Sequence, residues 1–377
     1  MINPQPHPDN PRLIVSSVQA LDIDWIKSLL MQTPQAAAAE SLASFRVEPL
    51  LEDAGNSLGQ LYRLRLAYHA KHMDWPQTLV VKLASQYESV REALKMAGLY
   101  PREVRFYSQW AGKTGIATAP CHYAALDEVS GDLIIVLDDL SELEETALHQ
   151  GCSLPQVEAV LESLATLHAQ WWEHDFGNTD FPAPYNGNLS FWQGVCSPWL
   201  AGLPQHVERL CPDWLEHLPA LEPWTTHLCR DLPDIYTRLA QAPCTLLHQD
   251  AHSENIRFAR TGTSLTPYFL DWQFVGYGRA GTDPSYFLIS SVPPERLAHH
   301  EESWLDFYHQ RLVQKGVNNY DLAACRKDYL DAFFRLLMIL VAIPHVSDMT
   351  REANRLFFET FLQRALAFAR RHQPSGD

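Results

Sequence analysis

The sequence predicts an α+β protein with two lobes: a small N-terminal lobe built on an antiparallel sheet and a larger, mainly helical C-terminal lobe. Two observations predict this division. Between residues 45 and 137, apolar and polar side chains alternate as they do in half-buried strands, with one helix among them. From residue 141 onward, apolar side chains recur at helical spacing. We therefore expect lobes over residues 1–137 and 138–377.

The N-terminal lobe contains several stretches with strand character. The clearest is residues 62–68, where tyrosine and leucine side chains alternate with Arg63, Arg65 and Ala67. The others are residues 45–51, 78–83 and 131–137, the last expected to form a hairpin with residues 121–125. One helix begins near Tyr100, with Pro101 in its first turn, where a backbone N–H would have no helical partner.

The C-terminal lobe begins its helical pattern at Ser153 and Pro155, which suit a helix start. We expect helices over residues 153–171, 304–313, 329–343 and 355–371. The section between residues 176 and 233 is rich in Pro, Trp and Asn, so it is predicted to form short helices and loops.

Composition and charge exclude several classes of protein. The 377 residues are 46% hydrophobic and carry a net charge of −16, which repels phosphates and anionic lipid. We therefore expect no nucleic-acid and no membrane partner, and the longest apolar run, residues 336–343, is too short to span a bilayer. The seven cysteines contain no C-x-x-C pair, which predicts free thiols and a cytoplasmic location. Oligomeric state has no signal in the sequence.

One stretch carries recognisable chemistry. Residues 246–258 read L-L-H-Q-D-A-H-S-E-N-I-R-F, so that Asp250 and Asn255 have the spacing D-x-x-x-x-N and His248 precedes Asp250 by two residues. The catalytic loop of protein kinases has the same spacing. Folding the following hairpin about Thr263 would place Asn255 opposite Asp271.

This pairing predicts a magnesium site. An amide oxygen from Asn255 and a carboxylate from Asp271 are hard oxygen ligands, which Mg²⁺ prefers. We assign Asp250 as the base that orients the attacking hydroxyl or accepts its proton. Two alternatives stay open. The match could be a chance one in a polar loop, or His248, His252 and Asp250 could hold zinc, although histidines at i and i+4 share a face only on a helix. His248 is better explained as a brace of the loop, and His252 as structural or substrate-facing.

A phosphoryl transferase also needs a cation on the nucleotide phosphates. Lys82 lies in an apolar strand, where a lysine is costly unless it is paired, and Glu103 on the following helix is the expected partner. Glu92 is the fallback partner. In the loop over residues 53–60, Asn56 and Ser57 would offer donors to the phosphates. Residues 112–114 do not form a P-loop, because the first glycine of that motif is missing.

These residues resemble the small-molecule branch of the protein-kinase-like superfamily, the aminoglycoside phosphotransferase and choline kinase group. The sequence is most similar to the ecdysteroid kinase-like subgroup. The resemblance runs from Gly55 to about Leu288. Besides the catalytic stretch, it is carried by residues 60–65, 80–82, 102–107, 164–168, 271–273 and 281–283. Two departures are Gln249, where many members have glycine, and a glycine-poor phosphate loop.

The resemblance implies a bilobal kinase fold with ATP and Mg²⁺ in the cleft, an N-terminal ATP-binding lobe and a C-terminal catalytic and acceptor-binding lobe. It implies that residues 137–140 contact the adenine through their backbone, that Asp283 supports the catalytic loop and that His168 is structural. The expected activity is ATP- and Mg²⁺-dependent phosphorylation of a small-molecule hydroxyl. One alternative is a degenerate kinase fold that only binds a nucleotide or ligand; it predicts loss of Lys82, Asp250, Asn255 or Asp271, and all four are present. The other is a His/Asp metal-dependent hydrolase.

Tryptophan is concentrated in one section of the C-terminal lobe. Six of the eleven tryptophans lie there: Trp171, Trp172, Trp192, Trp199, Trp214 and Trp224. Most such rings are expected in the core, with one or two facing the acceptor. An aromatic-lined pocket would suit an amphipathic alcohol or, through cation–π contact, a cationic one.

Overall fold

The computed structural model describes residues 13–50, 59–70, 72, 74–175 and 189–374. Two compact units are present. Unit 1 comprises Met1–Thr114 with Thr118–Glu142, and unit 2 comprises Gly115–Ala117 with Leu143–Asp377. The lobe boundary expected between residues 137 and 138 lies a few residues before this division and stays a prediction.

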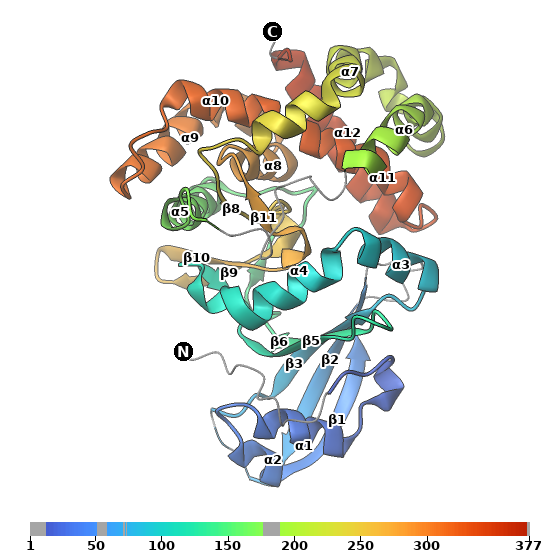
Figure 1. The fold of residues 1–377 in the computed structure, drawn as a ribbon, viewed down its shortest axis with the longest axis vertical. Helices are drawn as coiled ribbons and strands as arrows, with labels where there is room; N and C mark the ends of the chain where they lie inside the picture. Colours follow the sequence, from blue (N-terminus) through green and yellow to red (C-terminus); the bar gives the residue numbers. More distant parts are fainter. Residues whose placement is uncertain (1–12, 51–58, 71, 73, 176–188, 375–377) are drawn as a thin grey trace. The chain divides into compact units, whose positions relative to one another are not determined.

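Unit 1 is built on a five-stranded antiparallel sheet with the strand order β1-β2-β3-β6-β5 (Figure 1). The strands are β1 (Leu42–Pro49), β2 (Gly59–Tyr68), β3 (Thr78–Ala84), β5 (Cys121–Leu126) and β6 (Leu133–Asp138). The strands expected from alternating side chains are therefore confirmed, as is the hairpin between β5 and β6. The period-two pattern is clearest in β2, where Leu64 and Leu66 are buried in the core and Arg65 and Ala67 are exposed.

The helices of unit 1 lie before β1 and between β3 and β5. They are η1 (Val18–Ala20), α1 (Ile23–Met31), α2 (Ala37–Ser41), α3 (Glu88–Met96) and α4 (Leu99–Arg105), followed by η2 (Phe106–Trp110) and η3 (Ala111–Lys113). Asp22 caps α1 by accepting the backbone N–H of Trp25 at 2.7 Å. Ile26 and Leu29 of α1 pack against sheet residues such as Val81. The helix expected near Tyr100 is confirmed as α4.

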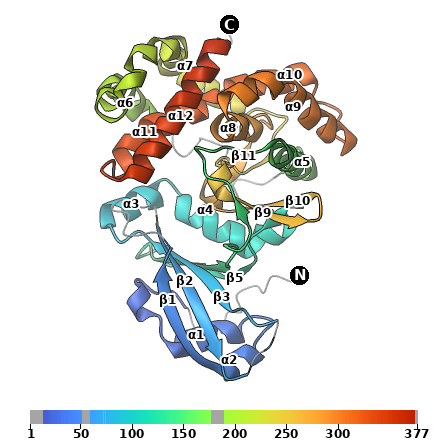
Figure 2. The ribbon, with the colours of Figure 1, turned by 180° about the vertical axis from the view of Figure 1, so that it is seen from behind.

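Unit 2 is mainly helical (Figure 2). Its helices are α5 (Leu154–Gln170), α6 (Leu189–Leu210), η4 (Pro212–Leu221), α7 (Glu222–Leu239), η5 (Ser253–Asn255), η6 (Trp272–Phe274), α8 (Thr282–Ser291), α9 (Pro294–Gln314), α10 (Leu322–Asp331), α11 (Phe333–Val346) and α12 (Glu352–Arg371). Its short strands are β7 (Glu144–Glu145), β8 (Thr245–Leu247), β9 (Ile256–Thr261), β10 (Ser264–Phe269) and β11 (Gly276–Gly278); β4 (Ala117–Thr118) also pairs with β10.

Three helices of unit 2 begin or end differently from the prediction. The helix expected over residues 304–313 is longer, since α9 starts at Pro294. The helix expected over residues 329–343 is divided at Ala332 between α10 and α11. By contrast, α5 begins where Ser153 and Pro155 predicted, with the Gln156 side chain accepting the backbone N–H of Ser153 at 2.8 Å.

In the section that was expected to form short helices and loops, the helices are longer and more regular than predicted. Residues 176–188 lie outside the described part, but α6 and α7 are long helices, with Pro198 and Pro204 inside α6 and a kink at Asp231 in α7. Each internal proline removes one helical hydrogen bond. Packing of apolar side chains such as Leu203 and Val207 stabilises α6 nevertheless, because tertiary burial outweighs local propensity.

The stretch Leu322–Val346 is long and apolar enough to span a membrane by length and composition alone, with a mean hydropathy of 1.6 in its most apolar window. However, 72% of that window is buried inside unit 2. Helices α8 and α12 pack against α11, as Figure 2 shows. The segment therefore has the burial of a core helix.

All seven cysteines are unpaired thiols. Burial raises the pKa of five of them to about 12: Cys121, Cys152, Cys196, Cys211 and Cys325. Cys229 on α7 is exposed. The free thiols expected from the spacing are confirmed.

Candidate active site

The catalytic stretch of unit 2 is anchored by short strands on both sides. Strand β8 pairs with β11 and places His248 at its end, and η5 then leads into the β9–β10 hairpin. Asp271 follows β10 directly. The loop therefore enters and leaves through ordered elements, which position its polar side chains.

The hairpin register differs by one residue from the prediction. Phe269 pairs with Ile256 and Ser264 with Thr261, so Asn255 is opposite Leu270 rather than Asp271; the Leu270 N–H donates to the Asn255 carbonyl at 2.8 Å. The reason is the turn. It contains only two residues, with a positive φ of 61° at Gly262, and is not centred on Thr263. Asn255 and Asp271 still lie at the same end of the hairpin, in neighbouring positions.

Asn255 is fixed onto Asp250. Its Nδ2 atom donates to the backbone carbonyl of Asp250 at 3.0 Å and to the Oδ2 atom of the same residue at 3.1 Å. Because the amide nitrogen faces Asp250, the amide oxygen points the other way. That oxygen is an acceptor only, which is the group that a hard cation requires.

His248 uses both ring nitrogens to hold the loop. Nε2 lies 2.9 Å from the Leu270 carbonyl, and Nδ1 lies 3.2 Å from the backbone N–H of Asp250. A neutral ring with its proton on Nε2 satisfies both contacts. Burial lowers the pKa of His248, which favours this neutral form. The histidine links the loop before Asp250 to the strand end before Asp271.

Asp283 of α8 binds the backbone of the same loop. Its fully buried carboxylate accepts the backbone N–H groups of His248 at 2.8 Å and Gln249 at 2.7 Å. His168 of α5 lies 3.1 Å from the same carboxylate and 2.5 Å from the Tyr308 hydroxyl. Burial alone would raise the pKa of Asp283, but the hydrogen bonds and the charges of the histidines outweigh it and hold that pKa below its usual value.

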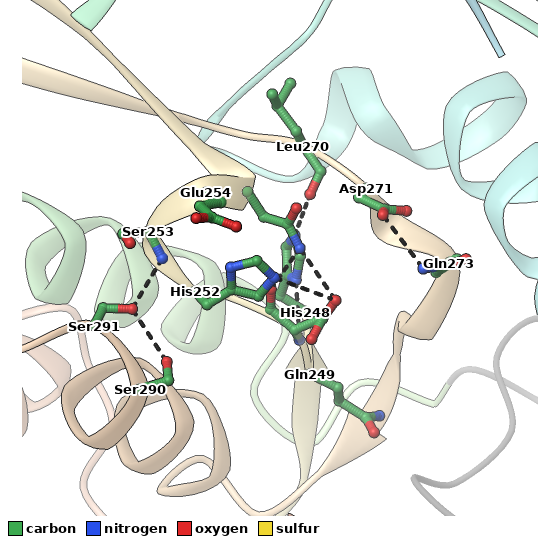
Figure 3. A network of polar contacts seen from close by, with 12 residues as sticks. His248, Gln249, His252, Ser253, Glu254, Leu270, Asp271, Gln273, Ser290 and Ser291 are labelled. Carbon is green, nitrogen blue, oxygen red and sulfur yellow. Dashed lines mark hydrogen bonds and ion pairs between the residues drawn. The ribbon is translucent and has the colours of Figure 1, made fainter. Parts of the chain in front are cut away.

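Two residues of the candidate site have left-handed backbone. Gln249 has a φ of 66° and Asp271 a φ of 58°, conformations that are uncommon for residues other than glycine. The Asp271 carboxylate accepts the Gln273 amide at 3.3 Å (Figure 3). Such backbone geometry is retained only where surrounding contacts enforce it, and it is concentrated at functional sites.

The structure gives little support to a zinc site. His252 Nε2 lies 3.9 Å from Asp250 Oδ2, too far for a hydrogen bond, and both nitrogens of His248 are committed to the backbone. Among the described residues, no group of three His, Cys, Asp or Glu side chains is arranged to hold a metal. The ring of His252 packs instead near Tyr286 and Phe357.

Unit 1 contains the lysine and glutamate singled out from the sequence. Lys82 on β3 lies 2.8 Å from the Oε1 atom of Glu103 on α4, and both residues are buried. Glu92, the fallback partner, is exposed on α3. A buried ion pair on a strand and the adjoining helix is the arrangement that phosphate-binding lysines have in kinases.

Other predicted positions of unit 1 have mixed outcomes. Asn56 and Ser57 lie outside the described residues. Residues 137–140 span the end of β6, where Asp139 binds Arg63 at 2.6 Å. Burial opposes ionisation of Asp139, but hydrogen bonds from Ser141 and Arg63 lower its pKa overall.

The tryptophans are mostly structural in the part of the chain that the structure describes. Trp224 is buried against Phe333 and Phe368, and Trp171 is also buried. Trp199 stacks on His345 with ring centres 4.6 Å apart. The side chain of Trp192 lies outside the described set.

Sequence reasoning missed Arg335. Its Nε atom donates to the backbone carbonyl of Gln249 at 3.0 Å, so it contacts the residue before Asp250. One signal in the sequence could have indicated it. Arg335 is a single charged residue in the first turn of an otherwise apolar helix, where a buried charge needs a partner.

A comparison with family models matches residues 54–317 to the ecdysteroid kinase-like family. The chain belongs to this family. The matched range includes both the Lys82–Glu103 pair and the whole catalytic stretch of this ecdysteroid kinase-like protein. No curated protein sequence gives a significant match.

Solved structures show the fold of this ecdysteroid kinase-like chain. Choline kinase from Cryptosporidium parvum Iowa II is 12% identical, with a TM-score of 0.52 over 91% of this chain and 95% of its own. Amicoumacin kinase in complex with AMP-PNP and Ca²⁺ is 14% identical, with a TM-score of 0.50 over 87% and 91%. The GDP complex of aminoglycoside 2′-phosphotransferase-IIIa is 14% identical, with a TM-score of 0.50 over 92% and 99%. The fold is therefore protein-kinase-like, as expected.

Proposed function

We propose that this protein transfers a phosphoryl group from ATP to a hydroxyl group of a small molecule, with Mg²⁺. The observation that carries the proposal is the contact of Asn255 with Asp250, which fixes a carboxylate and an outward-facing amide oxygen in one loop. The buried Lys82–Glu103 pair supports the proposal independently. Burying two charges carries a desolvation cost, and a role of the lysine in phosphate binding would explain why the pair is retained.

Each residue has a role in this reaction. Asp250 would orient the acceptor hydroxyl and take its proton, and His248 and Asp283 would keep its loop in place. Lys82 would contact the nucleotide phosphates, with Glu103 holding its ammonium group. Asn56 and Ser57 stay predicted phosphate contacts, and a cytoplasmic location stays a prediction.

The donor set fits magnesium rather than zinc. Asn255 and Asp271 would supply one amide and one carboxylate oxygen from neighbouring positions at the end of the hairpin. Mg²⁺ commonly takes few protein oxygens and completes its shell with water and phosphate. When bound, the ion would neutralise charge on the phosphates.

The test is ATP consumption by the purified chain with alcohols, amino sugars, choline analogues and steroids as acceptors. Asp250→Asn should lower turnover about 10²–10⁴-fold, the usual contribution of a positioned base. The matched control is Asp213→Asn, which changes an exposed aspartate on η4 and should leave turnover unchanged.

A nucleotide-binding test separates this proposal from the degenerate-fold alternative. ATP with Mg²⁺ should raise the melting temperature of the wild type, and Asp250→Asn should retain that shift while losing turnover. Binding without turnover on any acceptor would favour a nucleotide-binding protein, and full turnover by Asp250→Asn would contradict the assigned base.

A further inference from the structure

A buried cation lies against the catalytic loop without a carboxylate partner. Arg335, near the start of α11, has only 3% of its surface exposed. Its Nε atom donates to the Gln249 carbonyl at 3.0 Å, while its Nη2 atom is buried and has no hydrogen-bond partner. None of the ion pairs of the described residues includes Arg335, whereas the partly buried Arg279 is paired with Asp328 at 2.8 Å.

An unpaired guanidinium in this position is costly. Burying a charge requires compensation, and removing one partner of a buried pair is strongly destabilising. Two aromatic rings compensate in part: the guanidinium lies 4.6 Å from the ring centre of Phe274 and 5.9 Å from that of Tyr286. They leave the two N–H groups of Nη2 without an acceptor. A chain with a net charge of −16 has no shortage of carboxylates, so the missing partner is not explained by composition.

Gln249, the residue whose carbonyl Arg335 contacts, supplies a second unused donor. Its backbone N–H and carbonyl are committed to Asp283 and Arg335, but its side-chain Nε2 is buried and unpartnered. Figure 3 shows this amide on the side of the loop away from Ser290 and Ser291. One cationic and one neutral donor therefore flank the peptide that precedes Asp250.

We infer that Arg335 and Gln249 bind an anionic oxygen group of the acceptor, so that the acceptor is a hydroxy acid or another hydroxyl compound with a carboxylate or phosphate. Guanidinium and amide donors together match the paired oxygens of such a group. The inference rests on the proposed function, since it names the acceptor class. It disfavours a cationic acceptor, because a quaternary ammonium group here would meet the guanidinium charge.

The experiment compares matched acceptors at saturating ATP and Mg²⁺. The probes are glycolate, 4-hydroxybutanoate, 4-hydroxyphenylacetate and cholate, each with its primary amide, and choline as the cation. We expect at least one acid to exceed its amide at least 10-fold in kcat/KM. Arg335→Met should remove that preference, mainly by raising KM for the acid at least 10-fold, and Arg335→Lys should restore part of it.

Two further variants distinguish an effect on acceptor binding from a loss of folding. Gln249→Gly removes the second donor and suits the left-handed backbone, so it should fold while weakening the acid preference. Arg364→Met is the matched control, because Arg364 also has 3% of its surface exposed and an unpartnered Nη1 atom but contacts the Leu148 carbonyl. It should leave the ratio of acid to amide unchanged.

Binding is measured separately from turnover, in the Asp250→Asn background. The quantity measured is the rise in melting temperature on addition of each acid. If Arg335→Met removes this rise but no probe is phosphorylated, the anion site stands and the proposed function fails. If the wild type phosphorylates amides or choline as well as acids, the proposed function stands and the inference is wrong. If Arg335→Met weakens the shift caused by ATP and Mg²⁺ and not that caused by the acids, the anion is a nucleotide phosphate and the acceptor assignment is overturned.

Discussion

Asn255 donates one amide group to two atoms of Asp250, the backbone carbonyl and the carboxylate Oδ2. The contact makes the conformation of the loop depend on a side chain proposed as a metal ligand. Changes at Asn255 should therefore affect the orientation of Asp250 and the affinity for the cation together.

Asn255→Ala should lower turnover at least 100-fold and raise the Mg²⁺ concentration needed for half-maximal activity. The reason is that the variant loses both the amide oxygen and the two hydrogen bonds to Asp250. Steady-state kinetics at varied Mg²⁺ measure the effect. A variant with an unchanged Mg²⁺ requirement would show that Asn255 does not bind the ion.

Lys82→Met should destabilise unit 1 by about 3 kcal/mol, because it leaves the Glu103 carboxylate buried without its cation. It should also abolish the melting-temperature shift caused by ATP and Mg²⁺. The double variant Lys82→Met/Glu103→Leu should regain most of the stability and none of the nucleotide response. Chemical denaturation and thermal shift separate the two effects.

Matched controls for this pair lie on α3. Lys95→Met and Glu92→Gln alter exposed residues near in sequence, and both should keep stability and nucleotide response. If either control lost the nucleotide response while Lys82→Met kept it, the phosphate-binding residue would not be on β3.

Asp283→Asn should destabilise the protein by about 3 kcal/mol. The carboxylate accepts two backbone N–H groups and faces His168, and an asparagine amide would direct a donor at one of those groups. Turnover should fall as well, with kcat more affected than KM, because Asp283 touches the loop and not the substrate. Denaturation curves and kinetics on one preparation test this. If the variant is destabilised but its kcat is unchanged, the role of Asp283 is in folding stability alone.

Stability should fall on acidification below about pH 6.5, the ordinary pKa of histidine. Burial lowers the pKa of His248 in the folded protein, so the unfolded chain takes up a proton that the folded one does not. This contribution is present above pH 6.5 and is lost as pH falls through the folded pKa. His206 and His345, whose pKa values are also lowered by burial, act in the same direction.

The measurement is the free energy of unfolding from pH 8 to pH 5, in the wild type and in His248→Asn. The difference between the two slopes isolates His248 from the other histidines. When the measurement is extended below pH 4, protonation of Asp283, whose folded pKa lies under its usual value, should add a second loss. A wild type that gains stability between pH 7 and pH 5 would contradict the neutral state assigned to His248.

The sequence predicted those features that depend on local pattern. Alternating side chains identified the strands of unit 1, and the position of Lys82 in an apolar strand pointed to its pairing with Glu103. Motif spacing brought Asp250 and Asn255 together because only four residues separate them. The protein-kinase-like fold was implied by the family resemblance that these residues carry.

Features set by tertiary packing were not predictable in the same way. The hairpin register depended on a two-residue turn at Gly262, which shifts the partner of Asn255 by one position. The helical character of α6 depended on burial, against the local effect of its prolines. The contact of Arg335 with Gln249 joins residues 86 positions apart, and no local spacing reports such a contact.

The distribution of thiols has a practical consequence. The five cysteines whose pKa burial raises to about 12 are almost entirely protonated at neutral pH, and therefore react slowly with maleimides and iodoacetamide. Exposed Cys229 on α7 is then the preferred attachment point for a fluorophore. A dye introduced there without any mutagenesis would report ligand-dependent movements of this helix in the native chain.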